Sequence, residues 1–497
     1  MLRIFPLAII FFLILCPSFA KNFPESKQEK FETSFRPLVK VEGLPDYSTV
    51  SERMSFYHTP GMSIAVIHDG RIVWAKGYGV LQTGRKSAVN ESTVFEAASI
   101  SKPVTTIAAM MLVQKNLLDL DSGIYRWLHN WHAPRSEVSQ IPPTIRQIMS
   151  HTAGFNVESV SGYSSQNLPG LRDIMNGVGG AKTPALRVIW KPGEAFHYSG
   201  GGLDVLQQII NDVGSSSFEN QVSEMLFKPL QMTHSTFYQP PIPNLAKNEA
   251  KGHQWNGSLM TGYLYPEMAA AGLRTTPSDL AKIILEIQRA IEGKGHVLSP
   301  KSAEEILTLQ NASAPIGLGF FLSGKGAGKR FFHDGWNNGF TCRMVGFVGQ
   351  KDGAVVMTNS DSGGLMFEAL DAIARAYNWP DQNWKQLEAK QIPEGIINRF
   401  PGKYEWGPGL QADIIKLNSR LFLQLTRTES EEMEPFPPTE LFAKSVHDFF
   451  SAMPFMNFRF NLNKAQEVEA MEREEDGKQI RMPRLISQNL NSNKSIH

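Results

Sequence analysis

Cysteine is almost absent from this chain of 497 residues, which contains only Cys16 and Cys342. Cys16 lies in an apolar N-terminal segment that we expect to be removed, so Cys342 has no partner in the mature chain. An intramolecular disulfide is therefore excluded, and stability must come from hydrophobic cores. Because Cys342 lies inside an apolar strand pattern, we expect it to be buried and unreactive.

An excess of charge of one sign is also missing, since 49 basic residues face 48 acidic ones. This balance gives no reason to expect nucleic acid or an anionic membrane as a partner. His129 and His132 have the spacing of two metal ligands, but no third ligand is evident. We therefore expect neither a metal nor an organic cofactor.

Long hydrophobic runs are missing except at the N-terminus, "MLRIFPLAIIFFLILCPSFAK". One arginine, a run from about Ile4 to Cys16 and small residues before Lys21 are typical of a secretory signal peptide over 1–20. The run is too short to span a membrane comfortably. A lipid anchor on Cys16 is the alternative, but Leu15 stands where anchor signals require a small residue. We expect an exported protein, periplasmic or extracellular, with no membrane span in its mature form.

The mature length, roughly 477 residues, exceeds what one hydrophobic core usually serves. We expect more than one domain, divided as follows: a lead-in segment over 21–45, the main domain over 46–379, a linker rich in Gln, Asn, Lys and Pro over 380–395, an all-β domain over 396–488, and a disordered tail over 489–497.

The main domain begins and ends with strand patterns. Hairpins are predicted around Asp69-Gly70 and Asp352-Gly353. Amphipathic or apolar helices are predicted between them and after them, over 99–118, 203–212, 278–291 with Ser278 as N-cap, and 365–377. This order predicts an α/β (α+β) fold, with an antiparallel sheet closed by both ends of the domain, flanking helices and a helical subdomain.

The all-β domain is predicted from short alternating strands that follow one another closely beyond residue 396. Turns fall at Asn418-Ser419 and Asp476-Gly477. Such a pattern indicates a small barrel or sandwich.

A candidate nucleophile and base lie in "FEAASISKPVTT", where Ser99 precedes Lys102 by three residues. Positions i and i+3 share one face of a helix, with Cβ atoms about 5–6 Å apart. Pro103 is tolerated only in a first turn, so the helix begins near Ser99, where free N–H groups can stabilise an oxyanion. The pattern also arises by chance, as Ser18 and Lys21 show, and the pair alone is weak evidence.

Two further segments carry candidate functional groups. Tyr198 stands just before a glycine run that opens a helix, where its hydroxyl can relay a proton. His333 and Gly335 end an aromatic run that leads into a strand. A glycine there lets a substrate lie along the strand edge.

Taken in order, these segments resemble the motifs of the serine β-lactamase-like hydrolases, which include class C β-lactamases, D,D-peptidases, D-aminopeptidases and related esterases. The matching motifs are Ser99-Ile100-Ser101-Lys102, Tyr198-Ser199-Gly200 and His333-Asp334-Gly335. The resemblance covers about 50–375, and the all-β domain is similar to the lipocalin-like appendage of many such hydrolases. It implies a β-lactamase/transpeptidase-like fold with a C-terminal barrel.

The resemblance also implies roles for individual residues. Ser99 would be the nucleophile, and Lys102 and Tyr198 would share the roles of base and acid; which of the two is the base stays open. The oxyanion hole would be formed by the backbone N–H groups of Ser99 and Trp336. Substrate contacts would come from Gly200, His333, Asp334, Gly335 and Trp336.

Two departures from the family pattern bear on the substrate. Gly200 replaces an amide side chain, and His333-Asp334 replaces the Lys-Thr pair that faces a substrate carboxylate. An acidic Asp334 would repel such a carboxylate. The resemblance therefore implies a small-molecule ester, a D-amino-acid peptide or a peptidoglycan-derived substrate, cleaved through an acyl-enzyme.

Two alternatives remain beside this reading. One is a true β-lactamase or D,D-carboxypeptidase. The other is a catalytically silent relative that binds the cell wall or a protein, against which the intact Ser99, Lys102 and Tyr198 argue. The sequence leaves the oligomeric state open.

Overall fold

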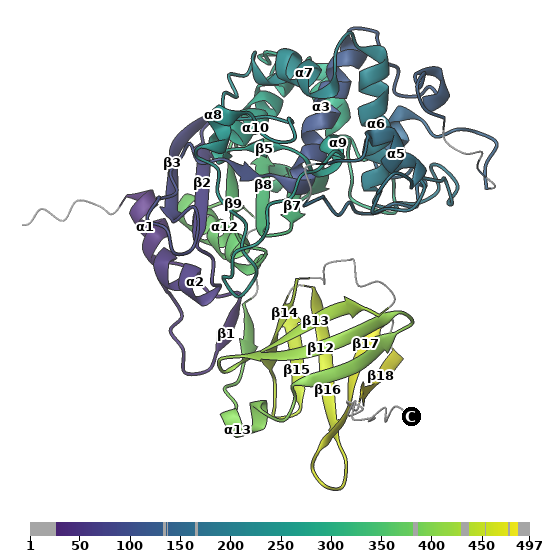
Figure 1. Cartoon of the computed structure of the whole chain (residues 1–497). Helices are drawn as coiled ribbons and strands as arrows, with labels where there is room; N and C mark the ends of the chain where they lie inside the picture. Colours follow the sequence, from purple (N-terminus) through teal and green to yellow (C-terminus); the bar gives the residue numbers. More distant parts are fainter. Residues whose placement is uncertain are drawn as a thin grey trace, which may run out of the picture.

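An antiparallel six-stranded sheet forms the centre of the main domain (Figure 1). The structure is a computed structural model that describes residues 26–132, 136, 138–164, 167–380, 386–428, 437–452, 454–475 and 478–485. The strands lie in the order β3 (Arg71–Gly79), β2 (Gly61–His68), β9 (Gly353–Thr358), β8 (Phe340–Phe347), β7 (Arg330–Asn337) and β6 (Phe321–Ser323). The expected signal peptide and C-terminal tail lie outside the described residues.

Both ends of the domain meet in this sheet, as predicted, because β2 pairs with β9 in antiparallel register from Met62↔Thr358 to Ile67↔Gly353. The first hairpin turns at Asp69 and Gly70, both with positive φ (51° and 71°). A glycine adopts this backbone conformation without the strain that a side chain brings. The Asp-Gly signal thus located the β2–β3 turn correctly.

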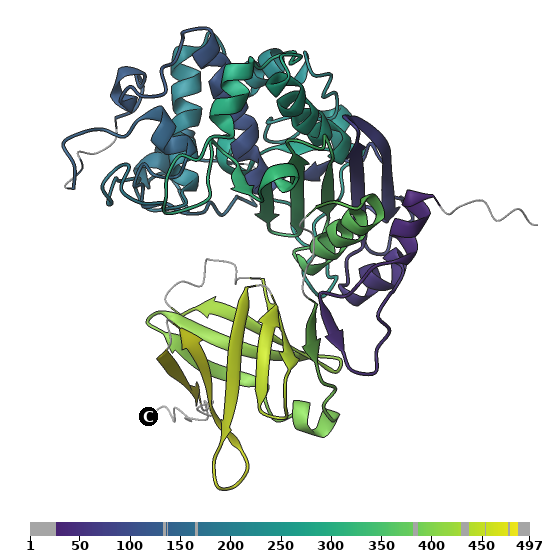
Figure 2. The same cartoon turned by 180° about the vertical axis from the view of Figure 1, so that it is seen from behind.

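Helices cover both faces of the sheet, and two cores result (Figures 1 and 2). One face packs against the helical subdomain, formed chiefly by α3 (Ser101–Gln114), α6 (Gly200–Val213) and α10 (Pro277–Ile291). The other packs against α1 (Lys27–Thr33), α2 (Val50–Phe56) and α12 (Gly364–Tyr377). The predicted N-cap Ser278 is wrong, since the side chain of Thr276 caps α10 and Pro277 fills the first position.

Shorter elements complete the subdomain. They are β4 (Phe95–Glu96), β5 (Arg274–Thr275), α4 (Ile145–Met149), α5 (Leu171–Asn176), α7 (Phe218–Val222), α8 (Pro243–Ala246), α9 (Met268–Ala271), α11 (Pro300–Ile306), the 3-10 turns η1 (Ala98–Ile100), η2 (Ile124–Arg126) and η4 (Gly326–Gly328), and the π-helical turn η3 (Ser223–Phe227). None of the helices in the described ranges is both long and apolar enough to span a bilayer.

The C-terminal strands form a closed eight-stranded barrel, which settles the choice between barrel and sandwich. It comprises β11 (Gly402–Gly407), β12 (Leu410–Leu417), β13 (Arg420–Arg427), β14 (Thr439–Ala443), β15 (Asp448–Ala452), β16 (Phe455–Leu462), β17 (Val468–Glu475) and β18 (Lys478–Leu485). Closure comes from pairing of β11 with β18. The predicted turn at Asn418-Ser419 joins β12 to β13, and the turn at 476–477 lies outside the described residues.

A parallel strand pair joins the two ends of the main domain beside the barrel. β1 (Val39–Val41) lies in the segment expected to be an irregular lead-in, and β10 (Leu387–Ala389) lies in the expected linker. The short helix α13 (Glu394–Ile397) follows, and its Ile397 packs into the barrel core. Both segments therefore contain regular structure, which their polar composition did not indicate.

Candidate active site

Ser99 lies in a tight turn between β4 and α3. The turn is fixed by Ser101, whose Oγ donates to the Ala98 carbonyl (2.6 Å) and accepts from the Leu273 amide (2.9 Å). Ala98 has a positive φ of 47°, a conformation that costs a residue with a side chain some energy. Ser99 is half-buried, whereas its neighbours Ala97, Ala98 and Ile100 are buried. The turn thus presents one serine from an otherwise apolar segment.

Lys102 lies directly beneath this serine, in the first turn of α3. Its side chain is 3% exposed, and Nζ lies 2.9 Å from Ser99 Oγ and 2.8 Å from the Ala270 carbonyl oxygen. No ion pair to a carboxylate holds Lys102 within the described part of the chain. The amine is therefore directed at the hydroxyl by packing and by one backbone carbonyl.

Tyr198 forms a wall beside these two residues. Lys102 Nζ lies 5.0 Å from the centroid of the Tyr198 ring. The next residue, Ser199, caps α6 by accepting from the Gly202 amide (3.0 Å). Gly200 then starts the helix in close packing, because a Cβ there would lie 3.2 Å from the Glu158 carbonyl oxygen. Gly200 offers only backbone to the site.

Strand β7 approaches the serine turn from the opposite side. A Cβ at Gly335 would lie 2.4 Å from both the Ala97 carbonyl oxygen and the Cys342 sulfur, so only glycine allows this contact. Trp336 follows with 42% of its surface exposed, and its indole N–H donates to the Asp361 carbonyl (3.2 Å). β7 therefore carries the backbone of Trp336 past the turn that holds Ser99, as an oxyanion hole would require.

His333 is buried in β7 and stays neutral. Its Nδ1 lies 2.6 Å from the Asp334 carbonyl oxygen, an acceptor, so Nδ1 carries the proton. Burial, with Lys102 and Arg343 nearby, lowers the pKa of His333 to about 3. Nε2 is buried without a hydrogen-bond partner among the described residues. His333 thus keeps an unused acceptor.

Asp334 bears on an expectation from the sequence. Successive residues of a strand point to opposite faces, so Asp334 lies on the face opposite to His333. There Arg343, its register partner on β8, donates from Nη1 to Asp334 Oδ2 (3.1 Å). This pair offsets the charge of the carboxylate, although Oδ1 has no hydrogen-bond partner among the described residues. The geometry thus argues against the predicted repulsion of substrate carboxylates, which stays a prediction.

Sequence reasoning missed His151 as part of the site. Its ring packs on Tyr198 with centroids 4.4 Å apart, and its Nδ1 accepts from the Ser199 amide (3.2 Å). Burial, and then the charge of Lys102, lower the pKa of His151 well below its usual value. His151 is therefore a neutral support for Tyr198. Its positive φ of 55° is the local signal that marks an unusual position, and it is visible only in the structure.

Two buried carboxyl groups also escaped the sequence analysis. In the described structure, Oδ1 of Asp204 in α6 and both carboxyl oxygens of Glu267, just before α9, have no hydrogen-bond partner. Burial raises the pKa of Glu267 to about 7 and that of Asp204 well above its usual range, while the charge of Lys102 acts against the latter shift. Their separation in sequence gave no reason to connect Asp204 with Lys102 or with Glu267.

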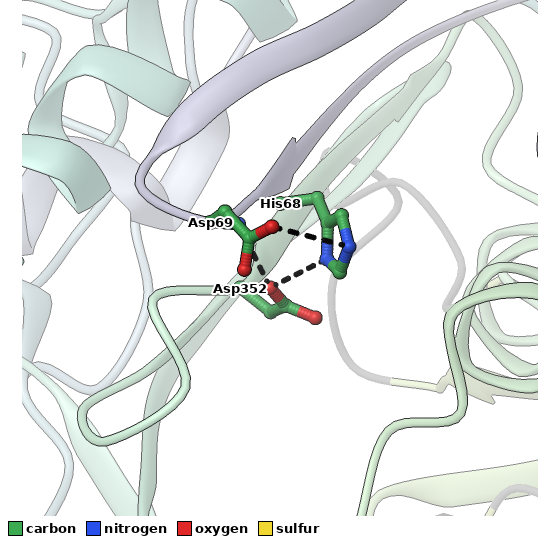
Figure 3. A group of neighbouring side chains, drawn as sticks. All are labelled: His68, Asp69 and Asp352. Carbon is green, nitrogen blue, oxygen red and sulfur yellow. Dashed lines mark hydrogen bonds and ion pairs between the residues drawn. The ribbon is translucent and has the colours of Figure 1, made fainter.

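His68, Asp69 and Asp352 form a compact group at the β2–β3 turn, and their side chains have the types and spacing of metal ligands (Figure 3). His68 Nδ1 lies 2.9 Å from Asp352 Oδ1, whose other oxygen accepts from Trp379 Nε1 (3.0 Å). The Lys27 ammonium lies 3.4 Å from His68 Nε2, where it would repel a cation. Hydrogen bonding within the protein accounts for these side chains.

Comparison with known proteins places this geometry among related chains. The Beta-lactamase family model matches residues 48–378. Protein flp of Staphylococcus aureus (strain N315) is 30% identical over 207 residues, which cover 40% of this chain and 39% of that protein. The chain thus spans about two fifths of that relative. Penicillin-binding protein 4* of Bacillus subtilis (strain 168) is 21% identical over 423 residues, covering 80% of this chain and 90% of that protein.

Solved structures show the same fold. The octameric penicillin-binding protein homologue from Pyrococcus abyssi has a TM-score of 0.58 at 21% identity, covering 87% of this chain and 98% of that chain. SurE, determined with D-Leu, has a TM-score of 0.55 at 22% identity, covering 88% and 97%. At these identities the likeness concerns the fold alone.

Proposed function

Because the chain belongs to the Beta-lactamase family, whose members are serine hydrolases, we propose that it cleaves an ester or amide bond through an acyl-enzyme. We further propose that it is exported, on the basis of its apolar N-terminal run. Within the family, the proposal is an esterase or a D-amino-acid peptidase.

The observation that carries the proposal is the position of Lys102. Its amine lies 2.9 Å from Ser99 Oγ, within the range in which a base can take the hydroxyl proton. Lys102 is buried, forms no ion pair with a carboxylate among the described residues, and contacts Ser99 instead. A purely structural serine has no need of it, and this favours catalysis over a silent binding role.

The proposed reaction follows from this geometry. Ser99 Oγ forms a bond to the carbonyl carbon while its proton passes to Lys102 Nζ, which must be unprotonated at that step, with Tyr198 beside it sharing the transfer. The carbonyl oxygen, now negative, lies toward the backbone N–H groups of Ser99 and Trp336. The leaving alcohol or amine departs with a proton, and water then cleaves the acyl–Ser99 bond.

The substrate class follows from His333 and Asp334. Neutral His333 keeps an acceptor nitrogen where the lactamases have a lysine, and the Asp334 carboxylate is paired with Arg343. A substrate that donates an N–H or O–H suits this site better than one that presents a carboxylate. Since SurE was determined with D-Leu, D-amino-acid amides are the first peptide-like substrates to test.

A labelling and hydrolysis experiment tests the proposal. The purified protein is treated with a fluorophosphonate probe and, separately, with short-chain p-nitrophenyl esters, D-amino-acid amides, a chromogenic cephalosporin and acyl-D-Ala-D-Ala. Ser99→Ala is the test variant, and Ser51→Ala, an exposed serine in α2, is the matched control. We expect labelling of Ser99 and turnover of esters or amides, both absent only in Ser99→Ala.

Each outcome decides between the readings. Turnover of the cephalosporin or of acyl-D-Ala-D-Ala alone would favour a β-lactamase or D,D-carboxypeptidase. Absence of both labelling and hydrolysis in the parent protein would favour the silent binding relative.

A further inference from the structure

A cavity of about 120 Å³ lies between the main domain and the barrel. The main domain contributes Tyr57, Trp255, Trp336 and Asp361, and the barrel contributes Arg420 and Phe422 among others. Strands β13 and β14 supply the barrel wall, at the barrel end that faces the main domain (Figure 1).

The walls of this cavity are largely aromatic. Trp255 and Phe422 meet across the two domains with ring centroids 4.6 Å apart. Trp336 adds an indole that is 42% exposed. Electron-rich ring faces attract cations, and the attraction is stronger where water is excluded.

Two of the three charged side chains that line the cavity neutralise each other. Arg420 binds Glu440 with two hydrogen bonds, of 2.7 Å and 2.6 Å. Its remaining guanidinium nitrogen donates to the Phe56 carbonyl (2.6 Å). This pair therefore leaves no charge for a ligand, and it holds the barrel against α2.

Asp361 is the third charged side chain, and it is left unmatched. It is 8% exposed, and its Oδ1 has no hydrogen-bond partner among the described residues. A buried acceptor without a partner is costly unless a ligand or water satisfies it. Backbone N–H groups of Asp361 and Trp255 act on this carboxylate, but no cationic side chain among the described residues forms an ion pair with it. A carboxyl group of this kind inside an aromatic cavity is suited to an ammonium group.

We propose that this interdomain cavity binds a primary ammonium group carried on an apolar or aromatic body, with Asp361 as its counter-ion and Trp255, Trp336 and Phe422 as its walls. The cavity adjoins the candidate active site through Trp336, whose indole N–H donates to the Asp361 carbonyl (3.2 Å). If the proposed hydrolase function holds, the ammonium belongs to the substrate, and the barrel takes part in its selection.

The charge state of Asp361 gives the site a pH dependence. Burial raises the pKa of Asp361 to about 7. The other titratable groups that line the cavity are Arg420, Glu440 and Tyr57, and the first two are paired with each other. An alkylammonium titrates near pH 10, about as lysine does, so among the lining groups Asp361 is the one that changes charge between pH 6 and pH 8. His58 lies near Arg420 and Glu440, and burial lowers its pKa below the usual value. Binding of the ammonium should therefore tighten as the pH rises through 7.

Equilibrium binding tests the proposal without any need for hydrolysis. The probes are 2-phenylethylammonium and its neutral counterpart 2-phenylethanol, titrated calorimetrically into full-length Ser99→Ala protein at pH 6 and pH 8. We expect the ammonium to bind at least tenfold more tightly than the alcohol at pH 8, and this preference to shrink at pH 6. Equal affinities at pH 8 would overturn the proposal, whatever the outcome of the hydrolysis tests.

Variants locate the site. Asp361→Asn should abolish the preference for the ammonium, whereas Asp173→Asn, an exposed aspartate in α5, should keep it. Phe422→Leu should weaken both probes while the preference remains, because the barrel wall contributes contact and no charge. A preference that persists in Asp361→Asn would place the cation elsewhere. Should that variant not fold, the pH dependence of the Ser99→Ala protein decides, since a flat profile contradicts the proposal.

Discussion

Arg343 and Asp334 stand opposite each other on the β7–β8 ladder, and the Arg343 guanidinium donates to Asp334 Oδ2 over 3.1 Å. The two side chains lie on the sheet face that packs against α12, where Arg343 also lies 5.0 Å from the Phe367 ring. The pair thus belongs to the support of β7, one strand face away from Ser99. This changes what a substitution at Asp334 should do.

Asp334→Asn should affect all substrates alike. The variant leaves the Arg343 charge without its partner in a largely buried place, which costs about 1–3 kcal/mol of unfolding free energy. Since the carboxylate does not face the substrate, kcat/KM for an anionic acyl-D-Ala-D-Ala and for a neutral p-nitrophenyl ester should change by the same factor. A tenfold gain confined to the anionic substrate would restore selection by charge at this residue.

Lys102→Met should remove nearly all turnover. Methionine fills a similar volume but cannot accept the Ser99 proton, and loss of a general base typically costs about 10²–10⁴-fold in rate. Lys115→Met, an exposed lysine at the end of the same helix, is the matched control and should behave like the parent. The measurement is kcat/KM at neutral pH for the best substrate of the panel. An unchanged rate in Lys102→Met would make the 2.9 Å contact with Ser99 incidental.

Gly335→Ala should disturb the fold and the site together. The added methyl would lie 2.4 Å from the Ala97 carbonyl oxygen, which is backbone and cannot move without shifting the turn of Ser99. Overpacking of this kind costs about 1–3 kcal/mol. Gly349→Ala, where the methyl group would have no atom within 4 Å, should leave stability and labelling unchanged. Thermal unfolding and the rate of fluorophosphonate labelling check both; equal behaviour of the two variants would contradict the close approach.

His333 should make the protein less stable in mild acid. Its folded pKa of about 3 lies below the unfolded value near 6.5, so protons bind preferentially to the unfolded state between these values. This contribution is fully present above about pH 6.5 and is lost by up to about 1.4 kcal/mol per pH unit as the pH falls toward 3. His333→Gln should flatten the slope of unfolding free energy between pH 4 and pH 6.5. Chemical unfolding at several pH values measures this slope, and identical slopes would mean that His333 binds its proton equally well in the folded and unfolded states.

Removal of the barrel should leave the reactivity of Ser99 intact and weaken ligand binding in the interdomain cavity. A chain that stops after residue 395 keeps β10 with its partner β1 and should fold with Ser99 still reactive toward fluorophosphonate. The same protein should bind both 2-phenylethylammonium and 2-phenylethanol more weakly, because Phe422 and the rest of the barrel wall are gone, while the preference that Asp361 gives to the ammonium remains. An insoluble or unlabelled product would mean that the barrel completes the core or the site of the main domain.

Sequence patterns predicted those features that depend on near neighbours. The Asp69-Gly70 turn, the start of α3 near Pro103 and the facing of Ser99 and Lys102 all follow from conformational preferences within a few residues. The N-cap of α10 was missed by two positions, because Thr276, Pro277 and Ser278 all suit a helix start and only the structure shows which one caps.

The features that escaped the sequence depend on contacts between distant segments. His151 contacts Tyr198, and Asp361 contacts Trp336, because the fold brings distant segments together; no motif with a fixed spacing links these residues in the sequence. Asp334 was assigned to the substrate because it belongs to a motif, yet the alternation of a strand directs it away. The sequence shows that His333 and Asp334 point to opposite faces of the strand. It does not show which of these faces is directed toward Ser99.

The pairing of β1 with β10 has a consequence for how the chain assembles. β1 is synthesised before the main domain, and its partner β10 is synthesised after it. Val39–Val41 therefore stays without its partner strand until synthesis of the main domain is complete. An unpaired strand edge invites association with other chains, and a strand of three residues keeps that exposure small. The position of the barrel is thus fixed last and from both ends of the main domain. A fusion partner or affinity tag placed next to β1 would therefore change how the barrel docks before it changed the chemistry at Ser99.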